Sequence, residues 1–169
     1  MTAIIDGTLG TTTPALTSTA TPTVVTPQSM VRSGSLSAGS GFGSTNTAIR
    51  TFATTISTQG SDISVGGSVA TLGSSFTINT AGVYSISYSD NANAASWYGI
   101  SLNSANLTTS VFSLPLAELL AMGTSSAANL AVNVNWEGYL AAGSVIRPHG
   151  VASQAAGSNT CTFTITRVA

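Results

Sequence analysis

The sequence offers few residues that could form a nucleophilic active site. His149 is the single histidine and Cys161 the single cysteine among 169 residues. A Ser, Cys or Thr nucleophile needs a positioned base beside it, but His149 stands in the segment RPHG, whose proline and glycine are typical of a turn. The Gly-x-Ser-x-Gly signature is also absent, because GGSVA at 66–70 lacks the last glycine. We therefore assign no catalytic residue.

The acidic residues are too dispersed to predict a carboxylate pair or a metal centre. They are Asp6, Asp62, Asp90, Glu118 and Glu137. A glycosidase needs two facing carboxylates, zinc needs clustered Cys and His, and the single carboxylate of SDNANAAS at 89–96 does not predict a calcium loop. The glycine-rich AGSGFGST at 38–45 lacks the lysine of a phosphate-binding loop, and we interpret it as a flexible link. The sequence predicts no metal and no cofactor.

Charge is scarce throughout the chain. Charged residues make up 5% of the sequence, against roughly 25% in ordinary globular proteins. The basic residues are scattered arginines: Arg32, Arg50, Arg147 and Arg167. Nucleic-acid binding needs clustered Lys and Arg, so we exclude a nucleic-acid partner. We interpret the low charge as a surface covered by copies of the chain or by neighbouring subunits, the alternative being a free surface that is polar without charge.

Three further features concern the compartment in which the chain folds. The best apolar run, LPLAELLAM at 114–122, contains Glu118 and is short, whereas a membrane span needs about 20 apolar residues. No Arg or Lys precedes Arg32, so the basic region of a secretory signal is missing, and a single cysteine allows no internal disulfide. We expect a soluble protein that matures in a reducing cytosol and has no membrane partner.

Downstream of residue 33 apolar residues alternate with polar ones over short segments. Alternation with a period of two is typical of strands that bury one face. The apolar positions are Phe52 and Ile56; Ile63 and Val65; Val69 and Leu72; Phe76 and Ile78; Tyr84, Ile86 and Tyr88; Tyr98, Ile100 and Leu102; Leu130, Val132, Val134 and Trp136; Val145; and Cys161, Phe163 and Ile165. About eight strands with Gly- and Asn-rich turns predict an all-β fold, a jelly-roll β-sandwich. One short helix is expected as well, capped by Ser113 and ended by Gly123.

Trp97 is the candidate for a binding surface. The alternation directs Tyr98 and Trp136 into the core, which leaves Trp97 facing outward. An exposed aromatic side chain suits a contact between subunits or the recognition of a glycan. We favour the subunit contact and keep glycan recognition as the alternative.

The first 33 residues differ from the rest of the chain. Pro14, Pro22 and Pro27 interrupt a Thr-rich stretch in which no helical or alternating pattern is sustained. Four apolar residues stand out in it: Ile4, Ile5, Val24 and Val25. We predict an extended Thr/Pro-rich attachment arm at 1–33 and a jelly-roll head at 34–169. The arm is either a disordered tail or a segment that becomes ordered on a partner through those four side chains.

Three segments of the head together form a pattern of spaced residues. The pattern consists of Thr77, Gly82, Tyr84, Ile86 and Tyr88 in TINTAGVYSISYS, Leu140, Gly143, Ser144 and Ile146 in WEGYLAAGSVIRP, and Phe163 and Ile165 in CTFTITRV. It resembles the jelly-roll family of tumour necrosis factor and the globular heads of complement's collagen-like recognition molecule. The match departs from the family at Ser144, where an acid is usual, and at the end, where a glycine is missing. Over residues 45–169 the resemblance implies a homotrimer, and Gly82 is expected to permit a tight turn into its strand.

The beginning of the chain carries a second resemblance. AIIDGTLGTTTP at 3–14 looks like the start of short virion proteins of tailed phages. This resemblance implies a non-enzymatic virion protein, assembled in the host cytoplasm, whose partners are its own copies and other virion proteins such as the major capsid protein. We favour a capsid decoration protein (a cement protein or head fibre), because the chain is short and has no shaft of repeats. The alternatives are a short tail fibre or receptor-binding protein that recognises a host-surface glycan, and a secreted complement-like recognition module.

Overall fold

The computed structural model describes residues 29–36, 40–43, 48–69, 72–155 and 161–169. The four apolar residues predicted to anchor the arm therefore lie outside the described residues. No helix within the described ranges is long and apolar enough to cross a membrane.

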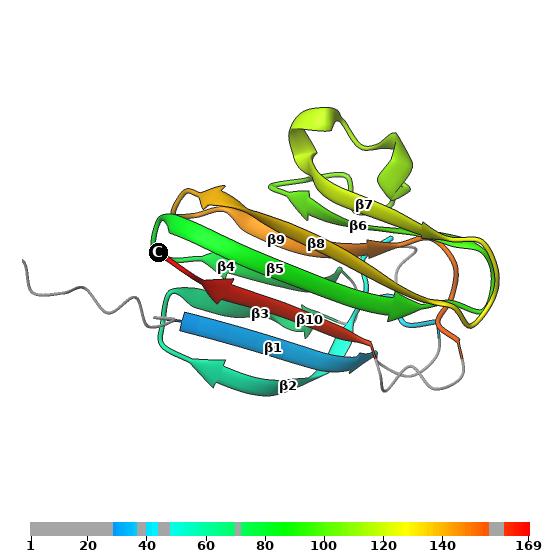
Figure 1. Ribbon diagram of the computed structural model, residues 1–169, viewed down its shortest axis with the longest axis horizontal. Helices are drawn as coiled ribbons and strands as arrows, with labels where there is room; N and C mark the ends of the chain where they lie inside the picture. Colours follow the sequence, from blue (N-terminus) through cyan, green and yellow to red (C-terminus); the bar gives the residue numbers. More distant parts are fainter. Residues whose placement is uncertain (1–28, 37–39, 44–47, 70–71, 156–160) are drawn as a thin grey trace, which may run out of the picture.

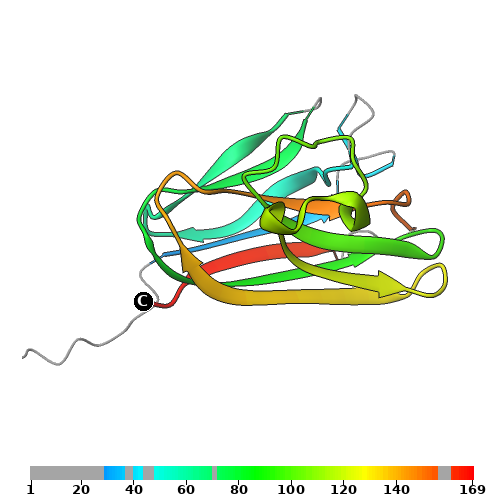
Figure 2. The same ribbon diagram turned by 90° about the horizontal axis from the view of Figure 1, so that it is seen from above.

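The described residues form two five-stranded antiparallel sheets that pack face to face as two layers (Figures 1 and 2). The first sheet has the spatial order β2 (Phe52–Gln59), β1 (Ser29–Leu36), β10 (Thr162–Arg167), β5 (Gly82–Asn91) and β8 (Ala131–Leu140). The second has the order β3 (Ile63–Val69), β4 (Gly73–Ile78), β9 (Val145–Gly150), β6 (Ser96–Leu102) and β7 (Leu119–Ser125). Many strands that are adjacent in a sheet are far apart in the sequence, as in a jelly roll. The predicted all-β jelly-roll sandwich is confirmed.

The core lies between the two sheets and contains most of the predicted alternating residues. The prediction was wrong for Ile56 and Val65, which are exposed on the edge strands β2 and β3, and for Leu72 and Leu130, which are exposed outside the strands. Tyr84, Ile86 and Tyr88 of β5 are all buried, while Ser87 between them is exposed. The ring of Phe163 on β10 stacks on Phe76 of the opposite sheet with centroids 4.8 Å apart. The faces of these strands are therefore the predicted ones.

Gly82 is required for a different reason than its expected tight turn. Its φ is not in the left-handed region. A Cβ at this position would collide with the carbonyl oxygen of Ala169, whose chain end is held beside β5 by a hydrogen bond from the Val83 N–H to the Ala169 carbonyl, 2.8 Å. The glycine therefore makes room for the end of the chain.

The boundary predicted after residue 33 falls inside β1. Ser33 pairs with Phe163 of β10 and with Thr55 of β2, so residues 29–33 belong to the head. The prediction missed β1 because its buried residues include the small, polar Ser29 and Ser33, which hide the alternation. Residues 1–28, called the N-terminal segment below, are what remains of the predicted arm.

Two other local predictions were wrong. Of the glycine-rich stretch, the described residues 40–43 lie between β1 and β2, where Phe42 bridges to Arg50, so the stretch does not link an arm to a head. The helix predicted from Ser113 to Gly123 is a single 3-10 turn, Leu116–Glu118, after which the chain enters β7. Leu119 and Leu120, which suit a helix, lie in strand β7 because β7 pairs with β6 along its length.

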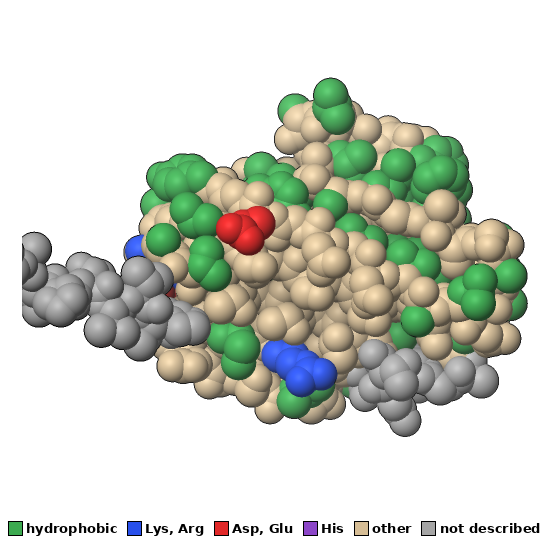
Figure 3. All heavy atoms as spheres, in the orientation of Figure 1, with side chains coloured by type: hydrophobic (Ala, Val, Ile, Leu, Met, Phe, Trp, Pro, Cys, Tyr) green, Lys and Arg blue, Asp and Glu red, His purple; other side chains and the backbone are tan. Residues whose placement is uncertain are grey.

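The outer face of the first sheet is broad and nearly uncharged. It carries rows of short polar side chains: Ser85, Ser87 and Ser89 of β5, Thr162, Thr164 and Thr166 of β10, and Asn133 and Asn135 of β8. Figure 3 shows this face, on which charged groups are isolated. Arg32 of β1 and Glu137 of β8 are exposed residues of this sheet. The low charge of the composition is thus visible on one continuous surface.

We expect Ile86→Ala to lower the free energy of unfolding by about 2–5 kcal/mol, because it removes buried methyl groups from the centre of β5. Urea unfolding of the full chain measures this loss. Ser126→Ala, in the exposed turn between β7 (Leu119–Ser125) and β8, is the control and should change the free energy by less than about 0.5 kcal/mol. Equal stability of Ile86→Ala and the parent would contradict the assigned core.

Candidate functional site

An aromatic pair lies exposed on the outside of the second sheet. Trp97 of β6 is 39% exposed and Phe112 is 56% exposed. Their ring centroids are 5.9 Å apart, and the rings are tilted by 55°. Tyr98, the next residue along β6, is fully buried, so the predicted outward orientation of Trp97 agrees with the structure. The sequence did not single out Phe112.

A glycine and a short helical turn bring Phe112 to Trp97. The first 3-10 turn, η1 (Val111–Ser113), follows β6 and projects beside β6 and β7 (Figure 1). Gly99 leaves a space that the side chain of Val111 occupies, and Val111 is fully buried there. With Val111 fixed in this way, the adjacent Phe112 lies against Trp97. A Val-Phe pair after a polar loop is a weak signal, which is why the sequence alone did not reveal it.

Two further exposed apolar side chains lie on the elements that contact β6. Met122 of β7 pairs with Gly99 and is 42% exposed, and Leu116 of the second turn is also exposed. Such a patch binds by contact area, against an apolar surface of another subunit or against the C–H face of a sugar ring. We call Trp97, Phe112, Leu116 and Met122 the aromatic patch.

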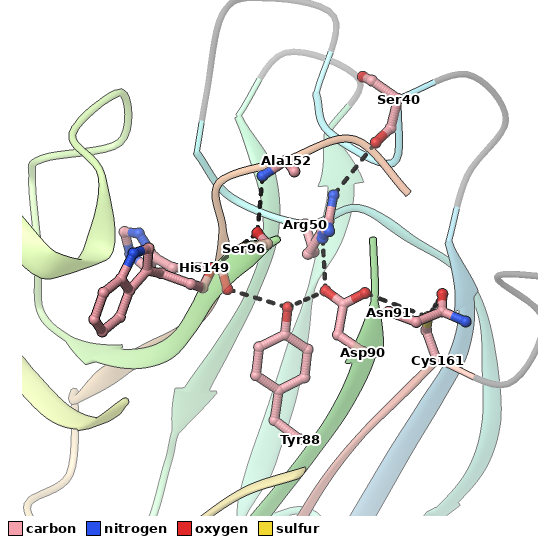
Figure 4. A network of polar contacts seen from close by, with 10 residues as sticks. Ser40, Arg50, Tyr88, Asp90, Asn91, Ser96, His149, Ala152 and Cys161 are labelled. Carbon is pink, nitrogen blue, oxygen red and sulfur yellow. Dashed lines mark hydrogen bonds and ion pairs between the residues drawn. The ribbon is translucent and has the colours of Figure 1, made fainter. Parts of the chain in front are cut away.

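A group of buried polar side chains lies at one end of the sandwich and centres on an ion pair (Figure 4). The Arg50 Nε donates to the Asp90 Oδ2 at 2.6 Å, and both side chains are at most 1% exposed. The hydroxyl of Tyr88 donates to the same carboxylate oxygen. The ring of Phe42 covers the guanidinium at 4.3 Å. Arg50 and Asp90 are therefore partners in the core, where the sequence had suggested only scattered arginines and an acid in a loop.

The environment of this ion pair keeps its neighbours protonated. Burial, reinforced by Asp90, raises the pKa of the Tyr88 hydroxyl well above its ordinary value. Burial and then Asp90 raise the pKa of the Cys161 thiol to about 12. Because the thiolate is the nucleophilic form of cysteine, Cys161 is unreactive at neutral pH.

His149 is a buried residue of β9 and does not lie in the predicted turn. Its Nε2 lies 2.9 Å from the Ser101 Oγ on β6, and both residues are fully buried. Burial, followed by the charge of Arg147, lowers the pKa of His149 to about 4, although Glu118 acts in the opposite direction. A serine beside a neutral histidine resembles a catalytic pair. Here the pair has no exposed surface, and among the described residues Nδ1 has no partner that would orient the ring.

The described residues hold no cluster of three or more His, Cys, Asp or Glu side chains that could bind a metal ion. The structure thus brings together the residues of the buried polar group, and it places Trp97 apart from them on the outer surface of the second sheet.

Comparisons with known proteins define the class of fold. No family model and no curated protein matches the chain. Among solved structures, the chain is similar to the crystal structure of murine APRIL at pH 8.0, with a TM-score of 0.54 and 12% sequence identity. The match covers 82% of this chain and 98% of the APRIL chain. The sandwich is therefore of the tumour-necrosis-factor-like type, and at this identity the likeness concerns the fold alone.

We expect the buried His149 to make the protein less stable in mild acid. The unfolded chain binds a proton to this residue below pH 6.5, whereas the folded chain does so only near pH 4. The free energy of unfolding should therefore fall by about 3 kcal/mol from this residue as the pH drops through that interval.

His149→Gln replaces the imidazole with an amide group, which can still hydrogen-bond the Ser101 hydroxyl but cannot take up a proton. Urea unfolding at a series of pH values should show a flatter profile for the variant between pH 6.5 and 4. Identical pH profiles of parent and variant would contradict the assignment.

Proposed function

We propose that the chain is a non-enzymatic structural protein of a tailed-phage particle, a homotrimeric capsid decoration protein anchored through its N-terminal segment. The observation that carries this proposal is the broad, nearly uncharged face of the first sheet, which suits a surface that copies of the chain cover. The resemblance of residues 3–14 to the start of phage virion proteins supports the setting. The virion, assembled in the host cytoplasm, is the proposed location.

The TNF-like fold supports a trimer, since proteins with this fold are typically trimeric. We place the contact between copies on the outer face of the first sheet, because exposed charge there is limited to Arg32 and Glu137 among the described residues of its strands. Short hydroxyl and amide side chains allow a close, partly hydrated contact with direct and water-mediated hydrogen bonds. The exposed Tyr139 at the end of β8 adds aromatic area to this face.

The absence of enzymatic activity is supported by the chemistry of the buried polar group. The Ser101–His149 pair is sealed from solvent, and the Cys161 thiol is protonated. Attachment is assigned to the N-terminal segment, whose Ile4 and Ile5 can add to the edge of a sheet in another virion protein.

The aromatic patch favours a second candidate function. A short tail fibre or receptor-binding protein would use Trp97 and Phe112 to stack on a host-surface glycan. The secreted complement-like module would use the same surface. Glycan-array binding that is lost on Trp97→Ala would favour these alternatives over decoration.

We expect the full chain to sediment as a trimer at micromolar concentration. Ser87→Arg introduces a charge at the centre of the proposed contact and should shift the protein to monomer. Ser126→Arg, in the exposed turn between β7 and β8, is the matched control and should stay trimeric. A monomeric parent would contradict the trimer.

The virion assignment has its own test. An antibody against the head should label purified particles of the phage that carries this sequence in immunogold microscopy. Decoration requires gold over the capsid. Gold confined to the tail would select the fibre alternative, and unlabelled particles would contradict a virion role.

A further inference from the structure

The outer edge of β2 is long and unprotected. β2 is the last strand of the first sheet, and among the described residues no strand pairs with its outer edge. Its sequence, FATTISTQ, contains no charge and no proline, and six of its eight residues are exposed. Lys, Pro, β-bulges and inward-pointing charges are the usual devices that keep an edge from pairing with another chain. Of these, β2 has only a bulge, at Ile56, which the register with β1 skips. The outer edge of β2 therefore presents N–H and C=O groups with which no described strand pairs and which another strand can use.

The other three outer edges are less open. β8 exposes the acidic Glu137. β3 contains Gly66 and Gly67, and its register shifts between Gly66 and Val69. β7 contacts β8 across the side of the sandwich, so these two edges lie together. The register of β2 also shifts, between its pairs with Arg32 and Ser33, but the strand contains no charge, proline or glycine, so it is the edge on which pairing meets the fewest obstacles.

We propose that the edge of β2 binds residues 23–26 of a second copy of the chain as an added antiparallel strand. The proposal deepens the proposed function, on which it rests for the association of copies. Residues 23–26 read Thr-Val-Val-Thr, four β-branched residues in a row, the type that favours strands. Pro22 and Pro27 flank them and limit the pairing to this length, because a proline has no N–H to donate.

The position of β1 determines how close this segment is to a β2 edge. Met30 pairs with Gln59, so β1 starts beside the end of β2. Ser29 is fixed there, because its Oγ donates to the Asp62 Oδ2 at 2.9 Å and accepts from the Asp62 N–H at 3.0 Å. Ser29, the first described residue, therefore lies at the Gln59 end of β2.

Strand direction favours a second copy over the chain's own edge. A segment that leads into Ser29 from along its own β2 would run toward Gln59, in the same direction as β2, and so would pair in parallel. A segment from another copy is free to run antiparallel, which is slightly more stable per residue and needs no crossover. Cyclic exchange of the segment among the three copies of the proposed trimer would pair every β2 edge.

Side chains on the edge suit this occupant. Ile56, in the middle of β2, is 52% exposed and lies over Gly34 of β1. A strand placed beside β2 would bring Val24 or Val25 against Ile56, adding an apolar cross-strand pair to the main-chain hydrogen bonds. Ile4 and Ile5, near the start of the chain, remain available for attachment to the particle.

The test is crosslinking between two full-length variants that are mixed. One carries Val24→Cys and the other Thr55→Cys, an exposed position of β2. After co-refolding, a short bismaleimide should join them into a product of two chains. The parent, whose Cys161 is buried, is the control and should give no product. A doubly substituted chain that crosslinks only within itself would overturn the exchange, and so would a mixture without a mixed product.

Two charged variants separate pairing at this edge from general proximity. Adding Thr54→Lys and Thr58→Lys to the Thr55→Cys chain should abolish the mixed product. Ser126→Lys with Ala128→Lys places the same charge on the exposed turn between β7 and β8 and should leave the yield unchanged. A mixed product that survives the β2 lysines would overturn the proposal.

Sedimentation of the Thr54→Lys, Thr58→Lys chain makes the two failures distinguishable. A trimer through the first-sheet face persists in this variant even if the edge accepts no strand. Loss of the mixed product with retention of the trimer supports the exchange as a separate contact. If the protein is a trimer but the Val24→Cys and Thr55→Cys chains, without added lysines, never crosslink, the exchange is overturned and the proposed function still stands.

Discussion

The buried ion pair between Arg50 and Asp90 determines how one end of the sandwich is built. Two charges removed from water are costly unless each is neutralised and hydrogen-bonded. Here the Asp90 carboxylate accepts from the Arg50 guanidinium and from the Tyr88 hydroxyl, and the Arg50 Nη1 donates to the Ser40 carbonyl at 3.3 Å. Because these partners come from β5 and from the segments before β2, the pair fixes those segments relative to each other.

The backbone of Arg50 is hydrogen-bonded to two strands of the second sheet. The Arg50 N–H donates to the Pro148 carbonyl of β9, and the Ser74 N–H of β4 donates to the Arg50 carbonyl. The residues around Arg50 therefore connect two strands of the second sheet just before the chain enters β2 in the first sheet. A side chain anchored in the core at this crossing keeps the chain between the sheets in one register. The Gly150 backbone lies so close to the guanidinium that a Cβ there would collide with it.

How far the sequence predicts this structure depends on the range of the interaction involved. The alternation of Tyr84, Ile86 and Tyr88 is a local property, and it predicted the faces of β5 correctly. The outward orientation of Trp97 followed from the same rule. The pairing of Arg50 with Asp90, 40 residues away, has no local signature, because a single sequence does not reveal which charges meet in the core. β1 was missed since Val31 is its main apolar side chain between buried serines.

The scarcity of charge connects the interior with the proposed role of the surface. With so few charged residues in the chain, a complete ion pair is placed in the core, while the outer face of the first sheet carries mainly hydroxyl and amide groups. An uncharged face and an uncharged β2 edge both lower the barrier to contact with other copies. We propose that the interior ion pair contributes to the specificity of the fold and that the neutral surface favours association between copies.

A double-mutant cycle on the ion pair tests the central claim most directly. The free energy of unfolding is measured for Arg50→Met, for Asp90→Asn and for the double variant. The account predicts that Arg50→Met, which leaves a buried carboxylate without its cation, costs about 3–5 kcal/mol. It also predicts that the double variant is less destabilised than the sum of the single variants, because the two side chains act as one unit. Additive effects, or a stable Arg50→Met protein, would contradict the account.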